Sequence, residues 1–262
     1  MGQRVWITGA SSGIGAACAR LYAAQAAQLV LTSSSAARLE TVAAECRAAG
    51  AAGVKVLPYD LSRPEGIPEL AEAAWAAFGG LDIVYCNAGI SQRTLVGDTT
   101  PEMIRQIMEV NYFAPVAMAQ AVLPHMLEQG GGHIAVTTSI AGRFGFPLRS
   151  GYSSSKFALY GFFETLQAEY YDRGIRVTLV CPGRVRTNIS LYALDKGGKP
   201  HGQMDPGQAG GISPERAART IVKAIRRGRR EVLVGGGELV MVWIKRLFPG
   251  LCARLARRIR PQ

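Results

Sequence analysis

The sequence contains few cysteines, and their placement argues against two structural uses. The five cysteines are Cys18, Cys46, Cys86, Cys181 and Cys252. Their number is odd, they are scattered, and they form neither a CxxC pair nor another spacing that is typical of a metal site. We therefore expect reduced thiols in a cytoplasmic protein, without a disulfide framework and without a bound metal.

Long hydrophobic runs are also lacking. No stretch approaches the roughly 18 consecutive apolar residues that a membrane-spanning helix needs. The first residues, MGQRVWITG, enter a strand-like run directly, without the hydrophobic region of a signal peptide. With 48% hydrophobic residues in 262, the composition suits one large core, and we expect a soluble single-domain protein.

Acidic residues are scarce at the C-terminal end. Residues 223–262 contain eleven of the 30 basic side chains and only two of the 19 acidic ones. The preceding 222 residues are nearly balanced, with 19 basic and 17 acidic side chains. The formal charge of +11 therefore indicates a partner for the tail rather than for the core.

Short β-branched runs alternate with alanine-rich amphipathic segments along the chain. We predict strands at 4–8, 28–32, 54–59, 82–86, 133–138, 176–180 and 231–234. Helices are predicted near 14–26, 36–49, 65–78, 101–127, 153–172 and 214–227. This alternation is typical of βαβ units, and continuously apolar strands fit a parallel sheet that is covered on both faces.

The fold that we predict is α/β, a single doubly wound Rossmann domain with a seven-stranded parallel sheet flanked by helices. It spans residues 1–236. The irregular, glycine-rich stretch at about 183–212 is predicted to be a lid over the substrate. Residues 237–262 are predicted to form a basic amphipathic C-terminal extension.

A glycine-rich turn follows the first predicted strand and leads into the first predicted helix. It reads TGASSGIG, residues 8–15, and its glycines permit a tight turn and a close backbone approach. The N-terminus of the following helix offers unpaired N–H groups and the positive end of its dipole to a pyrophosphate. Glycines alone would fit an ordinary turn, but this position between strand and helix indicates nucleotide binding.

The segment YSSSK places Tyr152 and Lys156 four residues apart, on one face of a helix. A free tyrosine has a pKa of about 10 and is a poor base near neutrality. A nearby positive charge lowers that pKa, so we predict that Lys156 lowers the pKa of Tyr152. Tyr152 would then act as general acid for ketone reduction or as general base for alcohol oxidation. The plain alternative is an exposed Tyr–Lys pair.

Five motifs in register make the chain resemble the short-chain dehydrogenase/reductase family from Arg4 to about Ile225. They are TGxxxGxG at 8–15, NAG at 87–89, Asn111, Ser139 and YxxxK at 152–156. The resemblance implies an oxidoreductase that transfers hydride between a nicotinamide cofactor and a ketone or secondary alcohol. It also implies a catalytic tetrad in which Ser139 orients the carbonyl and Tyr152 delivers the proton; the members are Asn111, Ser139, Tyr152 and Lys156.

Asn111 lies within a long predicted helix, where asparagine is usually a solvated surface residue. Pro115 has no N–H, so the carbonyl of Asn111 loses its helical partner. We predict that this carbonyl holds a water that links Lys156 to solvent as a proton relay, as the resemblance suggests.

The resemblance also implies a set of cofactor-binding residues. They come from the glycine turn, the ends of the second, third and fourth strands, the YxxxK motif and the segment CPGRVRT. Cys86 replaces the usual asparagine before NAG and is interpreted as a small buried hydrophobe. The residues are Gly9, Ser11, Ser12, Gly13, Ile14, Gly15, Ser33, Ser34, Asp60, Leu61, Asn87, Ala88, Gly89, Tyr152, Lys156, Pro182, Gly183 and Thr187.

The end of the second strand bears on the choice between NAD and NADP. It reads TSSS, residues 32–35, without the carboxylate of NAD-preferring relatives or the arginine that is common in NADP-preferring ones. Serine hydroxyls can bond a 2′-phosphate, and no carboxylate there repels it. We predict NADP(H) as the preferred cofactor, with NAD(H) as the alternative.

Apolar side chains from three segments, residues 90–94, 140–151 and 188–212, should line the substrate pocket. Their character favours a lipophilic ketone or alcohol. One alternative is a 3-ketoacyl or 3-ketosphinganine type reductase, which differs only in substrate. Another is a non-catalytic, cofactor-sensing scaffold, which would be expected to lose a member of the tetrad. The predicted pocket residues are Ile140, Phe146, Leu148, Ile189, Tyr192 and Met204.

The tail 238–260 has apolar residues at roughly helical spacing and a break or bend at Pro249-Gly250. It resembles the extension of membrane-associated family members that act on lipids, retinoids or steroids, and basic amphipathic helices bind anionic membranes. We nevertheless expect the tail to pack on the body or on another subunit, and contact with a membrane surface is the alternative. No motif predicts nucleic-acid binding. The tail arginines are Arg254, Arg257, Arg258 and Arg260.

The oligomeric state is inferred from the family resemblance. Relatives pair through the helices that match 101–127 and 153–172, so we expect a homo-oligomer, a dimer or tetramer.

Overall fold

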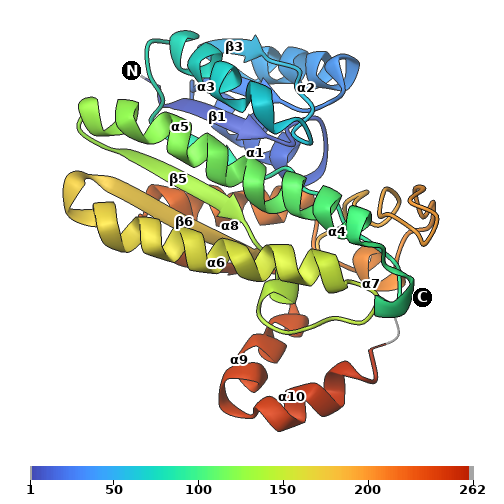
Figure 1. Cartoon of the computed structure of the whole chain (residues 1–262). Coiled ribbons are helices and arrows are strands. Elements are labelled where there is room, and N and C mark those ends of the chain that lie inside the picture. The colour runs from blue at the N-terminus through green and yellow to red at the C-terminus, as the bar shows by residue number, and fades with distance from the viewer. Residues whose placement is uncertain (1, 260–262) are drawn as a thin grey trace.

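A single parallel sheet organises the computed structural model of the chain, which describes residues 2–259 (Figure 1). Its seven strands lie in the order β3-β2-β1-β4-β5-β6-β7, and every neighbouring pair is parallel. The order reverses between β1 and β4, which is where doubly wound folds bind their ligands. The predicted fold class is confirmed. The strands are β1 Arg4–Thr8, β2 Gln28–Thr32, β3 Gly53–Val56, β4 Ile83–Cys86, β5 Gly132–Thr137, β6 Ile175–Pro182 and β7 Glu231–Val234.

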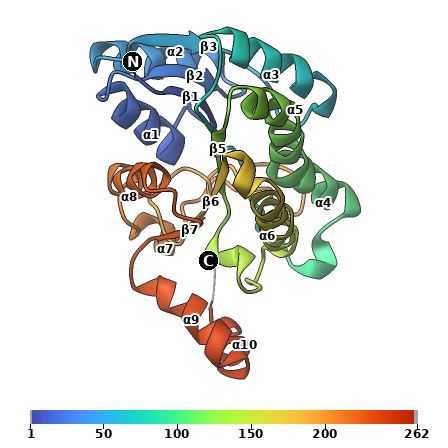
Figure 2. The ribbon, with the colours of Figure 1, turned by 90° about the vertical axis from the view of Figure 1, so that its left-hand side faces the viewer.

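Helices cover both faces of the sheet (Figure 2). One face carries α1 Gly13–Ala23, α2 Ala36–Ala48 and α8 Pro214–Arg226. The other carries α3 Ile67–Ala76, α4 Pro101–Met108, α5 Ala114–Glu128 and α6 Ser150–Tyr170. Outside these layers lie α7 Pro206–Ala209, α9 Val240–Leu247 and α10 Pro249–Ala256. Short 3-10 turns occupy Pro64–Gly66, Val96–Asp98, Ile140–Gly142, Tyr171–Arg173 and Gly237–Leu239.

Two apolar cores explain why the strands are continuously hydrophobic. Successive residues of a strand point to opposite faces of the sheet. In β1, Val5 and Ile7 pack in the core under α1, α2 and α8, whereas Trp6 packs in the core under α3, α5 and α6. All three are fully buried. A sheet that is covered on both sides therefore needs apolar residues at every position.

The observed elements differ from the predicted ones mainly at two places. The third strand ends at Val56 rather than at residue 59, because Pro58 cannot donate a ladder hydrogen bond. The helix predicted over 101–127 is interrupted by a π-helical segment, Glu109–Phe113. Pro115 follows this segment and has no N–H for the carbonyl of Asn111, which is the disturbance that the sequence indicates.

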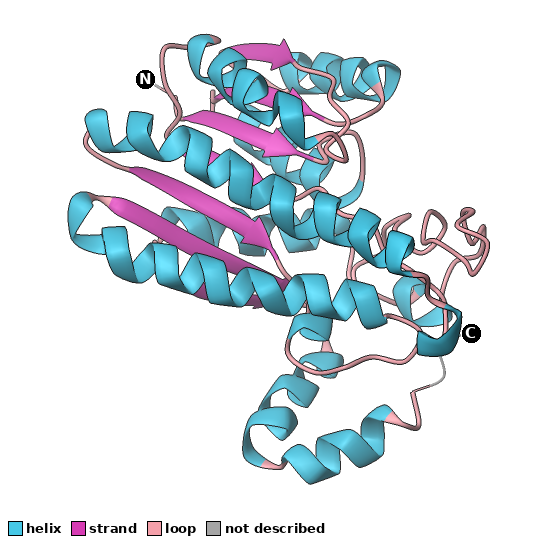
Figure 3. Ribbon diagram, viewed as in Figure 1, coloured by secondary structure: helices cyan, strands magenta, loops and turns pink. Residues whose placement is uncertain are grey.

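The predicted lid contains one short helix, α7, and is otherwise mostly loop (Figure 3). Three isolated bridges fix it, of which one joins Gln92 to Leu194. The C-terminal helices project from the body next to the segment that follows β5 (Figure 1). They separate at Phe248, so the predicted break at Pro249 is confirmed. Arg260 lies outside the described residues.

None of the helices in the described part of the chain reaches the length and apolarity that crossing a membrane requires. The inner face of α9 and α10 contributes to a third apolar cluster. Cys252 is 1% exposed there and packs with Ile140, Phe144 and Cys181. The C-terminal extension is thus joined to the body through the residue that follows Ser139.

Candidate active site

The carboxyl ends of four strands meet at the candidate site. The glycine turn follows β1, residues 87–89 follow β4, Ser139 follows β5, and Pro182 ends β6. Segments that are far apart in the sequence are therefore brought to one edge of the sheet, at the reversal of strand order.

The glycine turn forms a close backbone cradle. Gly9 and Gly13 have φ angles of 63° and 53°, in the left-handed region that favours glycine. A Cβ atom on Gly15 would lie 2.3 Å from the Gly9 carbonyl oxygen. The first turn of α1 carries no charged side chain, so the positive end of its dipole is open to an anion. These residues fit the pyrophosphate of a dinucleotide.

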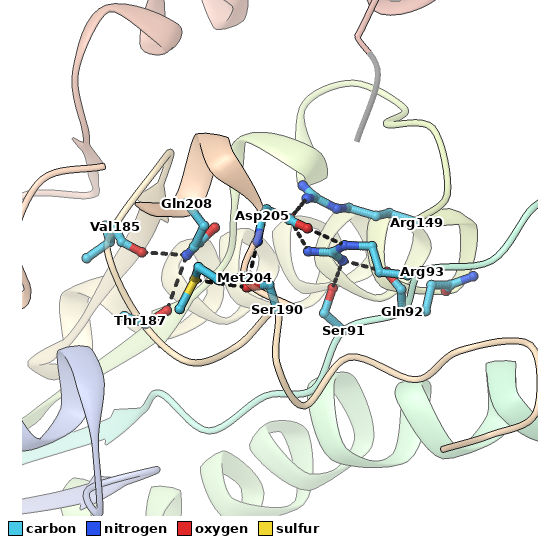
Figure 4. A network of polar contacts seen from close by, with 10 residues as sticks. All are labelled: Ser91, Gln92, Arg93, Arg149, Val185, Thr187, Ser190, Met204, Asp205 and Gln208. Carbon is cyan, nitrogen blue, oxygen red and sulfur yellow. Dashed lines mark hydrogen bonds and ion pairs between the residues drawn. The ribbon is translucent and has the colours of Figure 1, made fainter. Parts of the chain in front are cut away.

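The lid reaches this cradle through Thr187. A Cβ atom on Gly13 would lie 3.0 Å from Thr187 Cγ2. Gln208, on α7, donates from Nε2 to Thr187 Oγ1 at 3.2 Å and also to the Val185 carbonyl (Figure 4). Gln208 was not predicted, and it positions Thr187 over the glycine turn.

Residues 87–89 are held against both the first strand and the tetrad. The Asn87 and Ala88 N–H groups donate to Thr8 Oγ1 at 3.0 and 3.2 Å. A Cβ atom on Gly89 would lie 3.1 Å from Asn111 Oδ1 and 3.4 Å from Lys156 Nζ. Gly89 therefore leaves the room in which these two side chains meet.

Asn111 is buried, which contradicts the surface alternative for this residue. It is 1% exposed and lies in the π-helical segment. Its Nδ2 donates to the Ile90 carbonyl at 2.9 Å and to Ser155 Oγ at 3.0 Å, and its Oδ1 accepts from Ile90 N–H at 2.8 Å. The side chain thus ties the loop after β4 to α6. The water relay at its carbonyl stays a prediction.

Lys156 and Tyr152 lie on the buried face of α6. Lys156 is 2% exposed, and its Nζ donates to the Thr137 carbonyl at 2.8 Å. This nitrogen lies 5.8 Å from the centre of the Tyr152 ring. Ser139, 8% exposed, faces Tyr152 from the end of β5. The structure therefore brings all four predicted tetrad residues together.

The predicted lowering of the pKa of Tyr152 by Lys156 is wrong for this structure. Burial raises the pKa of Tyr152, and the neighbouring Ser139 hydroxyl, Arg149 and Arg93 offset only part of that rise. Burial also lowers the pKa of Lys156 from 10.5 to about 7. Desolvation dominates both groups because both are enclosed. A phenol with a raised pKa keeps its proton at neutral pH and can donate it.

An ion cluster of Arg93, Arg149 and Asp205, in which Arg93 and Asp205 are buried, was not predicted (Figure 4). Arg93 Nε donates to Asp205 Oδ1 at 3.1 Å, and its Nη2 pairs with Asp205 Oδ2. Arg149 Nη2 donates to the same Oδ2 at 2.7 Å. The three residues come from the loop after β4, the segment before α6 and the lid. The only signal in the sequence was their position in segments expected to wall the pocket.

The predicted pocket residues occupy different surroundings. Ile140 is buried under the C-terminal helices, and Phe146 packs against the same cluster. Leu148 has a left-handed φ of 61°. Ile189 is partly buried, and the sulfur of Met204, also partly buried, lies 3.2 Å from Ser190 Oγ. Tyr192 is instead 53% exposed, with its hydroxyl 3.4 Å from Arg38 Nη1 on α2.

The predicted residues near the ends of β2 and β3 are more exposed. Ser34 is exposed, and Ser33 Oγ accepts from Ser35 N–H at 3.3 Å. Asp60 is also exposed, and its Oδ1 accepts from both the N–H and the hydroxyl of Ser62. Leu61, in contrast, is buried in the core under α3.

The chain matches the family model described as short chain dehydrogenase over residues 3–196. It is 38% identical to Dehydrogenase/reductase SDR family member 7B of Bos taurus, with 98% of this chain and 82% of that protein covered. It is 35% identical to Dehydrogenase/reductase SDR family protein 7-like of Drosophila melanogaster, with 95% and 78% covered.

Solved structures have the same fold. A short chain dehydrogenase/reductase from Burkholderia phymatum in complex with NAD has a TM-score of 0.85 at 25% identity, with 100% of this chain and 96% of that chain covered. An alcohol dehydrogenase from Thermococcus sibiricus complexed with 5-hydroxy-NADP has a TM-score of 0.76 at 28% identity, with 90% and 97% covered.

Proposed function

Since the chain belongs to the short-chain dehydrogenase/reductase family and is an oxidoreductase, we propose that it interconverts a lipophilic ketone and its secondary alcohol with NADP(H) as the preferred cofactor. The observation that carries this proposal is the convergence of the four tetrad side chains beside the glycine cradle. A non-catalytic scaffold would not need to retain all four.

The proposed chemistry assigns one task to each side chain. A bound nicotinamide supplies or accepts the hydride. Ser139 orients the carbonyl oxygen of the substrate, and Tyr152 Oη donates its proton to that oxygen as the alcohol forms. Lys156, with a pKa of about 7, exchanges a proton near neutrality, and the Asn111 carbonyl holds the water that connects it to solvent.

The preference for NADP(H) is supported by Arg38, which the sequence reasoning missed. Ser35 caps the N-terminus of α2, and its hydroxyl accepts from Arg38 N–H at 3.5 Å. Arg38 therefore lies in the first turn of α2, three residues after the last of the serines that follow β2. Its guanidinium, which contacts the Tyr192 hydroxyl, supplies a positive charge next to these serines that would attract a 2′-phosphate.

The test is turnover with a panel of ketones of graded chain length and either NADPH or NADH. Tyr152→Phe is expected to reduce kcat by at least about 100-fold, because general acid catalysis contributes roughly 10²–10⁴. Tyr160→Phe is the matched control, since Tyr160 lies on the same helix and instead contacts Thr138 and Glu231. Cofactor binding should persist in both variants. Retained turnover in Tyr152→Phe would reject the role of this phenol.

We also propose that the outer face of the C-terminal helices contacts an anionic membrane surface. Trp243, Leu247 and Phe248 are 56%, 64% and 60% exposed, and basic residues flank them. Such a face combines apolar anchors with positive charge. Vesicles containing phosphatidylserine should sediment the protein, and vesicles of phosphatidylcholine should sediment less. Replacing Trp243 and Phe248 by serine should abolish the difference, and an unchanged difference would sink the idea.

A homo-oligomer is proposed through the faces of α4, α5 and α6. Phe157 on α6 and Phe113, at the end of the π-helical segment between α4 and α5, are 45% and 49% exposed, which supports a contact with a second copy. Light scattering on the purified protein tests this, and Phe157→Glu is expected to shift the mass toward the monomer. A monomeric wild type would contradict it.

A further inference from the structure

We propose that Arg149, supported by Arg93, binds an acidic group on the substrate, a carboxylate or a phosphate. This inference rests on the proposed function and specifies its substrate as an acidic ketone or alcohol. It concerns the ion cluster of Arg93, Arg149 and Asp205 (Figure 4).

The two arginines are satisfied to different degrees. Arg93 is enclosed, with its side chain 3% exposed, and pairs with Asp205 through two nitrogens. Its Nη1 also donates to Ser91 Oγ at 3.1 Å and to the Gln92 carbonyl at 2.5 Å. Arg149 bonds Asp205 through Nη2, and its buried Nε has no hydrogen-bond partner among residues 2–259. Arg149 therefore has donors to spare.

The charge of the cluster is unbalanced. Within the described chain, two guanidinium groups share one carboxylate, and that carboxylate is itself only 7% exposed on its side chain. A buried charge without a partner is unfavourable. The 21-residue helix α6 begins at Ser150, and its first turn carries no acidic side chain, so its positive dipole end adds to the same region. A ligand anion would balance this charge.

The cluster lies next to the reacting groups. Arg149 is three residues before Tyr152, and its carbonyl accepts from Ser153 N–H at 2.7 Å. Gln92, whose carbonyl bonds Arg93, accepts from Tyr152 N–H through its own side chain at 3.1 Å. Both arginines also act to lower the pKa of Tyr152. An acidic group bound here would therefore belong to the same substrate molecule whose carbonyl oxygen accepts the proton of Tyr152.

The backbone before Arg149 is strained in a way that fixes its position. Leu148 has a φ of 61°, a conformation that a branched residue keeps only when its neighbours enforce it. Its carbonyl accepts from Thr94 N–H at 3.2 Å, which joins this strained residue to the loop that carries Arg93. Strain of this kind clusters at binding sites.

An apolar wall borders the cluster. The Arg149 guanidinium carbon lies 4.9 Å from the centre of the Phe146 ring. Phe146 in turn packs against the apolar cluster that contains Ile140 and Phe144. The site thus joins a place for an anion to an apolar surface. We infer a substrate that carries both an acidic group and a hydrocarbon part.

The test compares an oxo fatty acid with its methyl ester, and an oxoalkyl phosphate with its dimethyl ester. Wild type is expected to have a kcat/KM at least tenfold higher for the acid of each pair. Arg149→Gln should reduce that acid-to-ester ratio ten- to a hundredfold, the range for a charge-assisted hydrogen bond. Arg149→Lys should retain part of it. Arg143→Gln is the matched control, because Arg143 belongs to the same segment but pairs with Glu231.

The outcomes distinguish this inference from a purely structural role, in which the ion cluster only holds the lid against the body through Asp205. Equal losses for acid and ester in Arg149→Gln would overturn the inference, as would a wild type that shows no preference. The pair that responds, carboxylate or phosphate, identifies the acid.

Direct binding distinguishes failure of this inference from failure of the proposed function. Decanoate, decyl phosphate and methyl decanoate can be titrated calorimetrically into the cofactor-loaded protein, which needs no turnover. Tighter binding of an acid that persists in Tyr152→Phe and is lost in Arg149→Gln supports the site even if no ketone is reduced. Turnover of ketones without any preference for acids overturns the site and leaves the proposed function intact.

Discussion

Replacing Lys156 by methionine should remove a pH dependence of stability that the fold imposes. Burial lowers the pKa of this ammonium from 10.5 in the unfolded chain to about 7, and the side chain is 2% exposed, so solvent screens it little. Between these two pKa values the unfolded chain holds a proton that the folded chain has released. The stability of the wild type therefore rises with pH across this window, and the penalty is fully present below about pH 7.

The size of the effect follows from the shift. Each pKa unit corresponds to about 1.4 kcal/mol, so a shift of this size amounts to roughly 5 kcal/mol over the whole window. Between about pH 6 and 9 the wild type should gain about 2–3 kcal/mol relative to Lys156→Met. The variant leaves the Thr137 carbonyl without its donor, which adds a cost that is independent of pH.

The assay is urea unfolding of the cofactor-free protein at several pH values, for wild type and variant. Groups that titrate in both proteins cancel in the difference between the two free energies of unfolding. Buried Cys86 is coupled to Lys156, but burial raises its pKa to about 12, so its thiol stays protonated in both folded proteins between pH 6 and 9. Two profiles that run parallel from pH 6 to 9 would refute the argument that desolvation of Lys156 sets its protonation.

Three further outcomes are expected. Arg38→Ala should lower the ratio of kcat/KM for NADPH over NADH about tenfold, the value of a charge-assisted hydrogen bond, and an unchanged ratio would place 2′-phosphate recognition elsewhere. Asn111→Ala should lower the free energy of unfolding by roughly 2–4 kcal/mol, because it leaves buried partners on the loop after β4 and on α6 unsatisfied; a loss below about 1 kcal/mol would contradict this. Gly15→Ala should weaken cofactor binding at least tenfold in a fluorescence titration, because its Cβ would lie 2.3 Å from the Gly9 carbonyl oxygen. Gly161→Ala is its control, since a Cβ there meets open space, and equal affinities would argue against the cradle.

Local patterns predicted the fold, and the resemblance to the family implied which four residues form the tetrad. Each strand is a run of apolar residues that must be covered on both faces, so a few neighbouring residues are enough to identify it as a strand of a parallel sheet. Pro115 removes one N–H, and the disturbance it causes at Asn111 was visible from two sequence positions. Such features depend on residues that are close together in the chain.

Features that depend on tertiary contacts were not predictable. The ion cluster is one example, because its members Arg93, Arg149 and Asp205 are far apart in sequence. Each resembles an ordinary surface charge in the sequence, and only the folded chain brings them together. The pKa of Tyr152 depends on enclosure, which spacing on a helix does not reveal; an argument from charge alone therefore gave the wrong sign. Arg38 lies beyond residues 32–35, where a charge that reads the 2′ position is expected, and the start of α2 brings it next to them.

The packing of Cys252 against Ile140 means that the C-terminal helices are part of the wall beside Ser139 rather than a detachable appendage. A truncated chain would lose this support together with the outer apolar face, so substitutions on that face are the cleaner way to study it. The same cluster separates the outer face of these helices from the end of β5 by one layer of side chains, so a substitution in the cluster should affect both the packing of the helices and the position of Ser139.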